Sequence, residues 1–203
     1  MKFITKGTEP VEWKAYKTTE GVEFRAIDEL QNALLQEQGY LCCYCMSRIS
    51  KEKMKVEHWK PRRYTASIFD FDNLFAACEG NFCTDKHCDT KKDYHEITIH
   101  PADTKNNCEN IIDYGLASGK LTYHEAYTTD IETTLNLNNK VLISNRLAVL
   151  AAVQKVLTAK KYKKVEIQKL MSKFSTKDKS GKFQAYCQIV LKLLYKKLKS
   201  SKI

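Results

Sequence analysis

The sequence predicts an α+β protein that is mainly helical. Three observations lead to this expectation: apolar residues recur at helical spacing over long stretches, two short segments have strand-like composition, and six of eight cysteines fall between residues 42 and 88. A chain of 203 residues is long enough for one ordinary domain. We expect residues 1–139 to form a cysteine-braced α+β part and residues 140–203 a helical lobe packed on the same core.

Four stretches have helical periodicity. Residues 22–38 place five apolar side chains on one stripe, and Gly39 follows where a helix would be capped. Residues 141–159 are long and mostly apolar, and residues 165–174 form a shorter helix. Residues 182–199 have apolar residues on one face and lysines on the other, the pattern of a surface helix.

The strand signals lie among the cysteines. Residues 55–59 are short and strand-like, and Pro61 stops them from continuing as a central strand. NLFAA, residues 73–77, is a second apolar segment, and CDTKKDYHE, residues 88–96, has the composition of a short helix. The predicted order is therefore helix, cysteine pair, strand, strand, cysteine loop and helix.

Positive charge is concentrated near the C-terminal end. Residues 140–203 contain 17 lysines and arginines against two acidic residues, whereas residues 1–139 contain 17 against 22. The net charges are thus +15 and −5 within a total of +10. Such asymmetry favours contact with a polyanion, because each phosphate neutralised by a cationic side chain releases condensed counterions. The alternative is that the lysines only solvate helix faces.

The composition predicts a cytoplasmic protein with no membrane segment. The sequence shows no uninterrupted apolar run of the length that spans a bilayer, and the opening MKFITKGTEPVEW turns polar too early for a signal peptide. Cytoplasmic thiols stay reduced, so the clustered cysteines are better candidates for metal ligands than for disulfides. Thiol redox chemistry at LCCYC has no thioredoxin-like pattern around it.

A four-cysteine zinc site is predicted from the spacing. Cys42 and Cys45 have the C-x2-C spacing of a zinc knuckle, which Cys43 and Cys45 lack. The second pair comes from Cys78, Cys83 and Cys88, with His87 as an outside candidate. We favour Cys78 and Cys88 because one ends a predicted strand and the other begins a predicted helix. Such a closed site would be structural rather than catalytic.

The segment VEHWKPRR places Glu57 directly before His58. The series C-x2-C, Glu-His, DNLFAAC and CDTKK resembles the HNH nucleases, whose ββα-metal core is often braced by four cysteines. TKGTEPVEW, LLQEQGYLCCYC, TTLNLNNKVLISNR and GKFQAYCQIVLKLLYKK look like the retron-associated and Septu-type HNH proteins, so the likeness covers most of the chain. It is looser between residues 97 and 130.

The resemblance implies roles for four residues. His58 matches the general base and Glu57 the acidic metal ligand beside it. Asn73 matches the middle asparagine that fixes the loop, and the third position, usually His or Asn, falls on Asp89. Here the sequence departs from the family, and His87 and His95 are substitutes. The resemblance also implies bacterial antiphage defence with an ABC/SMC-like ATPase partner, and possibly a retron element.

The residue types suit phosphodiester hydrolysis. Histidine can take a proton from water near neutral pH, and Glu57 with Asp89 could hold Mg²⁺ or another hard divalent ion through oxygens. Cationic side chains near the motif are candidates to grip nucleic acid: Lys60, Arg62, Arg63, Lys91 and Lys92. The alternative function is an inactive zinc-braced module that binds nucleic acid or an ATPase. The sequence does not decide whether the substrate is DNA or RNA, whether cleavage is sequence-specific, how many chains bind the ATPase, or what triggers activity.

Overall fold

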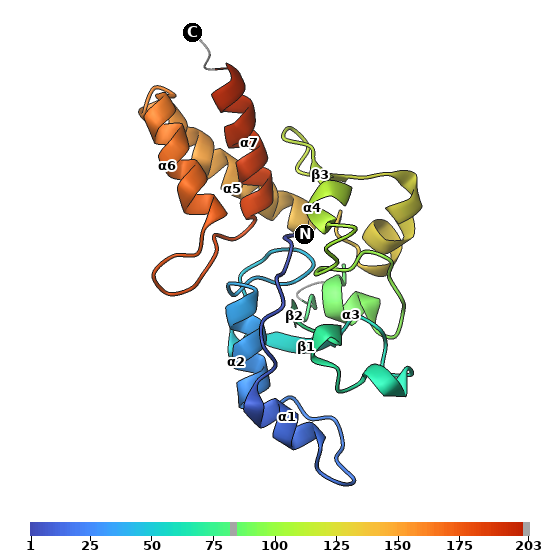
Figure 1. Cartoon of the computed structure of the whole chain (residues 1–203). Coiled ribbons are helices and arrows are strands. Elements are labelled where there is room, and N and C mark those ends of the chain that lie inside the picture. The colour runs from blue at the N-terminus through green and yellow to red at the C-terminus, as the bar shows by residue number, and fades with distance from the viewer. Residues whose placement is uncertain (82–84, 201–203) are drawn as a thin grey trace.

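The protein is an α+β molecule in which helices predominate (Figure 1). The structure is a computed structural model, and it describes residues 1–81 and 85–200. The helices are α1 Val11–Lys17, α2 Asp28–Glu37, α3 Cys88–Lys92, α4 Cys108–Ile111, α5 Lys140–Ala159, α6 Lys164–Ser175 and α7 Cys187–Ser200. The strands are β1 Met54–His58, β2 Leu74–Cys78, β3 Asp113–Tyr114 and β4 Leu121–Thr122, which pair as two antiparallel hairpins.

The β1–β2 hairpin forms the centre of the N-terminal part. Its register pairs Met54 with Cys78 and His58 with Leu74, so the Glu-His dipeptide ends β1 at the mouth of the connecting loop. Every residue of β2 is buried, because two helices pack against this strand: α2, which precedes the hairpin in the sequence, and α3, which follows it. The chain order β1, β2, α3 is the strand–strand–helix order that the sequence predicted.

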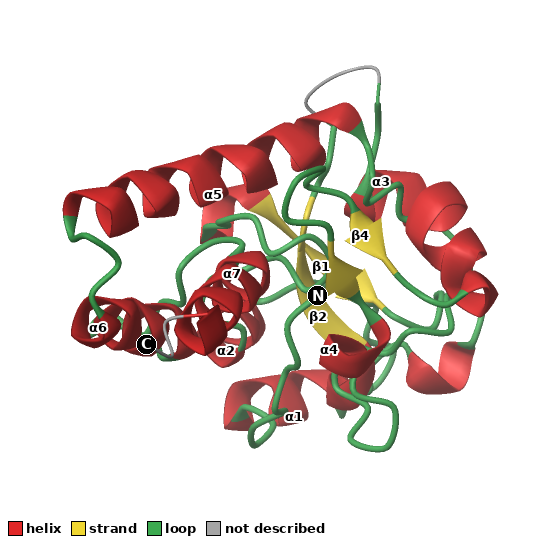
Figure 2. Cartoon of the chain, turned by 90° about the horizontal axis from the view of Figure 1, so that it is seen from above, coloured by secondary structure: helices red, strands yellow, loops and turns green. Residues whose placement is uncertain are grey.

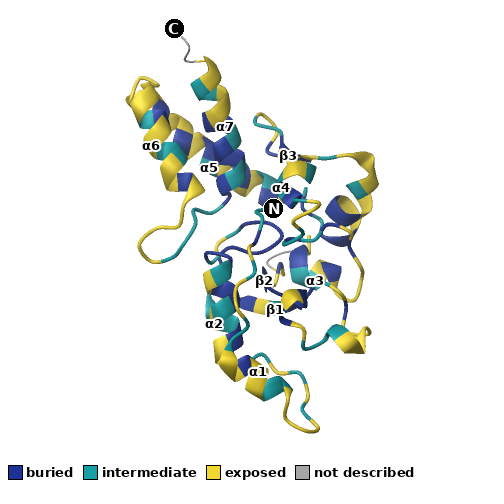
Figure 3. Cartoon of the chain, viewed as in Figure 1, coloured by how far each residue is buried: buried dark blue, intermediate teal, exposed yellow. Residues whose placement is uncertain are grey.

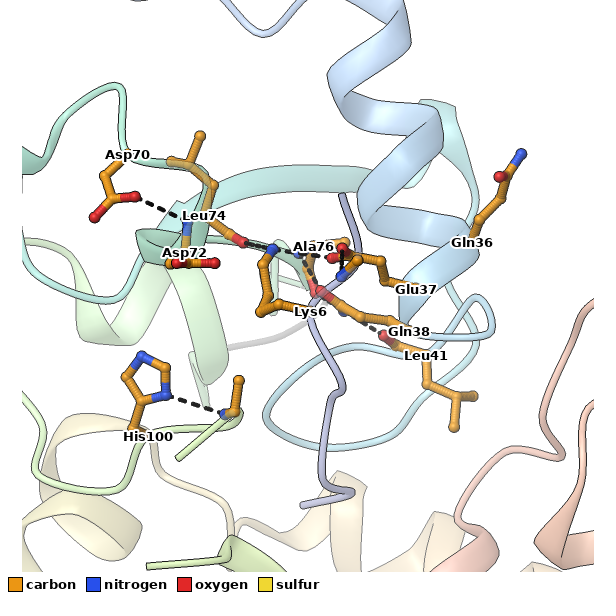
Figure 4. Close-up of polar contacts among 12 residues, drawn as sticks. Lys6, Gln36, Glu37, Gln38, Leu41, Asp70, Asp72, Leu74, Ala76 and His100 are labelled. Atoms are coloured by element: carbon orange, nitrogen blue, oxygen red, sulfur yellow. Dashed lines mark hydrogen bonds and ion pairs between the residues drawn. The ribbon is translucent and has the colours of Figure 1, made fainter. Parts of the chain in front are cut away.

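The free edge of β2 is closed by a buried glutamine (Figure 4). Gln38 donates from Nε2 to the carbonyl oxygens of Ala76, at 2.7 Å, and Leu41, at 2.8 Å, and its Oε1 accepts from the Ala76 N–H at 2.7 Å. The Cys43 N–H also donates to the Ala76 carbonyl oxygen, at 3.0 Å. These bonds take the place of a third strand, since an unpaired buried edge would leave peptide groups unsatisfied.

A lysine fastens the N-terminal segment to the same hairpin. The Lys6 ammonium lies 2.9 Å from Glu37 Oε2 and donates to the Leu74 carbonyl oxygen at 3.1 Å, as Figure 4 shows. It also lies 3.8 Å from the centre of the Phe71 ring. Burial lowers the pKa of Lys6, and the Glu37 carboxylate opposes that shift. The ion pair therefore joins α2, β2 and the first residues of the chain.

The three C-terminal helices form a lobe that lies above the hairpin in Figure 1 and extends to the left of it in Figure 2. α7 packs against both α5 and α6 and contacts β3 as well. α7 is the best-buried of the three, whereas the outer surface of α6 is largely exposed (Figure 3). Arg146 of α5 is buried and donates to the carbonyl oxygens of Gly119, at 2.6 Å, and Leu137, at 2.7 Å. The lobe is therefore tied to the middle of the chain.

Two predicted helices begin later than expected. Residues 22–27 are not helical, and α2 begins at Asp28 after an extended Ile27, but its end at Gly39, with φ +57°, is as predicted. Residues 182–186 are also not helical. Phe183 donates to the Gly39 carbonyl oxygen and Tyr186 to that of Met46, at 3.0 and 3.1 Å. These long-range hydrogen bonds override the local helical pattern.

One helix of the described residues could cross a membrane by length and composition alone. α5 has 20 residues and a mean hydropathy of 1.4, and 28% of that window is buried. The core helix of a soluble protein passes the same test, so this is weak evidence for a membrane segment.

We expect Gln38→Met to lower the free energy of unfolding by about 2–4 kcal/mol, because it leaves the Ala76 N–H and two facing carbonyl groups with fewer partners. Gln36→Met is the matched control: Gln36 lies in the last turn of α2, just before Gln38, is exposed and turned away from the hairpin in Figure 4, and should change stability by less than about 0.5 kcal/mol. Urea unfolding of both variants checks this, and equal effects would contradict the role assigned to Gln38.

Candidate metal centre and active site

Four buried cysteines lie close enough to hold a metal ion such as zinc. The Sγ atoms of Cys42, Cys45, Cys78 and Cys88 all lie within 4.8 Å of one another. The Sγ–Sγ distance is 3.8 Å for Cys42 and Cys88 and 3.6 Å for Cys45 and Cys78. Four thiolates at tetrahedral zinc, with Zn–S near 2.3 Å, are about 3.8 Å apart. The donor set and its spacing therefore fit a closed zinc site.

Backbone geometry in the knuckle turns its two thiols toward each other. The Met46 N–H donates to the Cys42 carbonyl oxygen at 3.1 Å, and Met46 has a positive φ of 63° that reverses the chain. Ser47 donates its N–H to Cys45 Sγ at 3.4 Å. Although burial opposes ionisation, hydrogen bonds from the neighbouring thiols lower the pKa of Cys42 well below its usual value. The cluster thus stabilises a thiolate.

The second pair is placed by the ends of two elements. Cys78 is the last residue of β2 and Cys88 the first of α3. Cys88 has a φ of 51° and donates its N–H to the Leu135 carbonyl oxygen at 3.1 Å. Gly80 permits the close return of the chain: a Cβ there would lie 1.9 Å from the His87 carbonyl oxygen. The structure therefore brings together the pair that we favoured.

The other candidate ligands take different places. Cys43 is buried outside the group of four, and burial raises its thiol pKa well above the usual value, so it stays protonated. His87 is buried, with Nδ1 3.9 Å from Cys78 Sγ, and stands beside the cluster. Cys83 lies outside the described residues.

Glu57 sits in a buried polar network opposite α3. Its Oε1 accepts from the Tyr44 hydroxyl at 2.9 Å and lies 2.7 Å from the Lys92 ammonium. Its carboxyl group also interacts with the side chain of Asp89, likewise on α3, which raises the pKa of Glu57 further. Burial raises the pKa of Glu57 to about 8 despite the opposing charge of Lys92, and burial also raises the pKa of Asp89. The two predicted oxygen ligands are therefore neighbours.

His58 is held in one tautomer by the loop that follows β1. Its Nε2 lies 3.0 Å from the Ile68 carbonyl oxygen, an acceptor that requires a proton on Nε2. Nδ1 is then the basic nitrogen, and Arg62 Nε donates to it at 3.4 Å. The ring meets Phe24 edge to face at 4.5 Å. Burial, assisted by the charge of Arg62, lowers the pKa of His58 to about 4, so the ring is neutral at pH 7.

A pocket of about 420 Å³ joins these groups. Glu57, His58, Arg62 and Asp89 line it, and Pro61, Thr90 and Tyr94 are among its other walls. Among the described residues, neither substitute histidine lines this pocket. His87 belongs to the cysteine side, and His95 is exposed and stacks on Tyr94 at 4.7 Å. Asp89 remains the candidate for the third position.

Asn73 clamps the loop between the strands. Its Oδ1 accepts from the Lys60 N–H at 2.7 Å, and its Nδ2 donates to the carbonyl oxygens of Lys60, at 3.1 Å, and Ser67, at 3.0 Å. Asn73 is buried and does not line the pocket. It shapes the loop that carries the Ile68 carbonyl, which is the role that the resemblance implies.

The predicted basic residues divide between surface and interior. Lys60, Arg62, Arg63 and Lys91 are exposed, although Arg63 pairs with Glu96. The structure corrects the prediction for Lys92, which was expected on the nucleic-acid surface: its side chain is fully buried. The physical reason is the Glu57 carboxylate, which offers a buried partner for the ammonium when α3 packs on the hairpin.

Two contacts of Glu57 in this site, with Tyr44 and with Lys92, were not predicted. Tyr44 lies between the knuckle cysteines, where an aromatic residue suggests core packing, and Lys92 looks like one of many surface lysines. Nothing in their sequence context distinguishes them. Both touch Glu57 only through the tertiary fold.

Comparison with known proteins adds no assignment. A scan against protein-family models returns no match, and a search of curated protein sequences returns none either. The functional argument therefore depends on the residues and their geometry.

We expect Cys88→Ala to lose bound zinc and to unfold at much lower temperature, because structural zinc supplies on the order of 10 kcal/mol of folding free energy. Cys43→Ala, which removes a buried thiol beside the ligands, should keep one zinc per chain. Elemental analysis of purified protein and thermal unfolding with and without a chelator measure both effects. Zinc retained in full by Cys88→Ala would rule out this ligand set.

Proposed function

We propose that this protein is a metal-dependent HNH endonuclease that hydrolyses phosphodiester bonds of nucleic acid. The observation that carries the proposal is the pairing, in one pocket, of a neutral histidine with a fixed tautomer and two adjacent carboxyl groups. His58, Glu57 and Asp89 come from the end of β1 and the start of α3. This strand–strand–helix frame supports the resemblance to HNH nucleases.

His58 is suited to act as the general base. Its Nε2–H is held by the Ile68 carbonyl oxygen, which leaves the Nδ1 lone pair to accept a proton from water in the pocket. The same carbonyl would stabilise the imidazolium that forms after proton transfer. In the free protein Arg62 donates to Nδ1, and it lies over the Phe24 ring at 4.8 Å. A phosphate in the pocket would offer Arg62 a stronger partner and free the base.

Glu57 and Asp89 would hold the divalent ion. Carboxylate oxygens are the ligands that Mg²⁺ prefers, and the two groups line the same pocket. When bound, the ion would neutralise negative charge that develops on the phosphate and the leaving oxygen.

The exposed cations give the pocket a basic surround. Lys60, Arg62 and Lys91 are exposed around the loop and α3, where they could bind flanking phosphates. The lysines of the C-terminal lobe, many of them exposed, would extend the contact. We further propose, from the resemblance alone, that the nuclease acts in bacterial antiphage defence, in the cytoplasm, with an ABC-type ATPase.

We expect His58→Ala to reduce metal-dependent cleavage by about 10²–10⁴-fold, because general-base catalysis contributes that much. His124→Ala, at an exposed histidine outside the pocket, is the matched control and should cleave like the parent. The assay uses plasmid, single-stranded DNA and structured RNA with several divalent metals, with and without the co-purifying ATPase. Unchanged cleavage by His58→Ala would sink the nuclease assignment. A parent that binds nucleic acid without cutting it would favour the scaffold alternative.

Binding by the basic lobe should depend on salt. Lys160 and Lys164 are exposed at the turn between α5 and α6, and replacing both with glutamine should lower the slope of log affinity against log salt by about 2, since each phosphate contact contributes about 0.9. Lys14→Gln with Lys105→Gln, two exposed lysines outside the lobe, should leave the slope nearly unchanged. Fluorescence anisotropy at several salt concentrations measures it, and equal slopes would contradict the role of the lobe.

A further inference from the structure

Lys92 is a buried charged group beside the pocket that the proposed mechanism does not use. Its side chain is fully buried, which is rare for lysine without a partner. The ammonium lies 2.7 Å from Glu57 Oε1 and donates to the His58 carbonyl oxygen at 2.9 Å. Lys92 is the last residue of α3, the helix that also carries Asp89. The chain therefore has its own cation at the pair of carboxyl groups.

The ammonium is held there by groups on both sides. Glu57 Oε1 accepts from the Tyr44 hydroxyl as well as from Lys92, and the carboxyl group also meets Asp89. Tyr44 is fixed because it lies between the knuckle cysteines, and the His58 carbonyl is fixed because it ends β1. Lys92 has no exposed surface through which its charge could be solvated where it is.

The electrostatic consequence concerns a divalent ion. When Glu57 and Asp89 have both lost their protons, as ligands of a metal ion must, they present two negative charges, and the buried ammonium cancels one of them. An ion that approaches Glu57 and Asp89 is also repelled by Lys92, which water screens little at a buried position. A backbone phosphate brings one negative charge into the same pocket and restores the balance.

Resting on the nuclease function proposed above, we propose that Lys92 is a positioning residue that makes divalent-ion binding by Glu57 and Asp89 depend on nucleic acid. The ammonium keeps the affinity for the ion low in the free protein. A phosphate of the substrate raises that affinity because it adds negative charge and oxygen ligands. Ion and nucleic acid then bind with positive coupling, each strengthening the other by the same factor.

The test is an Mn²⁺ titration followed by electron paramagnetic resonance, which counts the free aqueous ion. The zinc-loaded full chain carries His58→Ala to prevent cleavage, and Mn²⁺ is added alone and then with excess duplex DNA or structured RNA. In this background we expect Mn²⁺ to bind about tenfold more tightly with nucleic acid. Lys92→Met should bind Mn²⁺ about tenfold more tightly without nucleic acid, and the further gain on adding it should fall below about threefold.

Charge and hydrogen bonding are separated by two further variants. Lys92→Arg keeps the charge and should behave like Lys92. Lys92→Gln keeps a donor without the charge and should behave like Lys92→Met. If Lys92 only satisfies Glu57 structurally, its removal would lower the unfolding temperature and leave Mn²⁺ affinity unchanged, which overturns the proposal. If both uncharged variants fail to fold, the His58→Ala protein that keeps Lys92 still tests the proposal. Equal Mn²⁺ affinity with and without nucleic acid in that protein overturns the proposal.

Failure of this inference is distinguishable from failure of the nuclease function. Glu57→Gln with Asp89→Asn reports whether the Mn²⁺ is bound at this pair, and cleavage by the parent reports the activity. If the parent cleaves nucleic acid with a divalent metal, but Mn²⁺ and nucleic acid do not strengthen each other's binding, only the role proposed for Lys92 is wrong. If the parent does not cleave nucleic acid, and Glu57→Gln with Asp89→Asn does not weaken Mn²⁺ binding, then both the nuclease function and this inference are wrong.

Discussion

The constraint on which the rest of this structure depends is the cluster of four cysteine sulfurs. It joins the knuckle after α2, the end of β2 and the start of α3 at one point. α3 has only five residues, too few to be stable as an isolated helix. Its position over the hairpin must therefore come from its attachments, one of which is Cys88, the first residue of α3 and a member of the cluster. The positions of Asp89 and Lys92, which lie on the same short helix, therefore depend on the position of Cys88.

A second set of contacts runs from this cluster to the candidate active site. Tyr44 reaches from the knuckle to Glu57, and Lys92 reaches from α3 to Glu57 and to the His58 carbonyl. Asn73 holds the loop that presents the Ile68 carbonyl to His58. Glu57 and His58 are thus each oriented by hydrogen-bond partners, and such networks hold a site rigid when all members are satisfied. The cysteine cluster is separate from the proposed chemistry but supports it.

The knuckle also anchors the basic lobe. The chain enters α7 through hydrogen bonds from Phe183 to Gly39 and from Tyr186 to Met46, on either side of the cysteine pair. Arg48 of the knuckle contacts the Phe183 carbonyl as well. The lysine-rich helices and the pocket are therefore both attached to the short segment that carries Cys42 and Cys45. This arrangement suits the function proposed above, in which the lobe would bind a polyanion and the pocket would act on it.

The sequence by itself determined the elements whose signals are local. The apolar spacing of α5 and α6, the two strand segments and the C-x2-C of Cys42 and Cys45 are properties of neighbouring residues, and they were predicted within a few positions. Only the tertiary structure decided that Cys78 and Cys88 complete the cluster, that α7 begins at Cys187, and that Lys92 is buried. These outcomes depend on which distant segments meet. A lysine or a tyrosine has the same local pattern whether it faces solvent or a buried carboxylate, so the partner across the fold, Glu57, settles where Lys92 and Tyr44 lie.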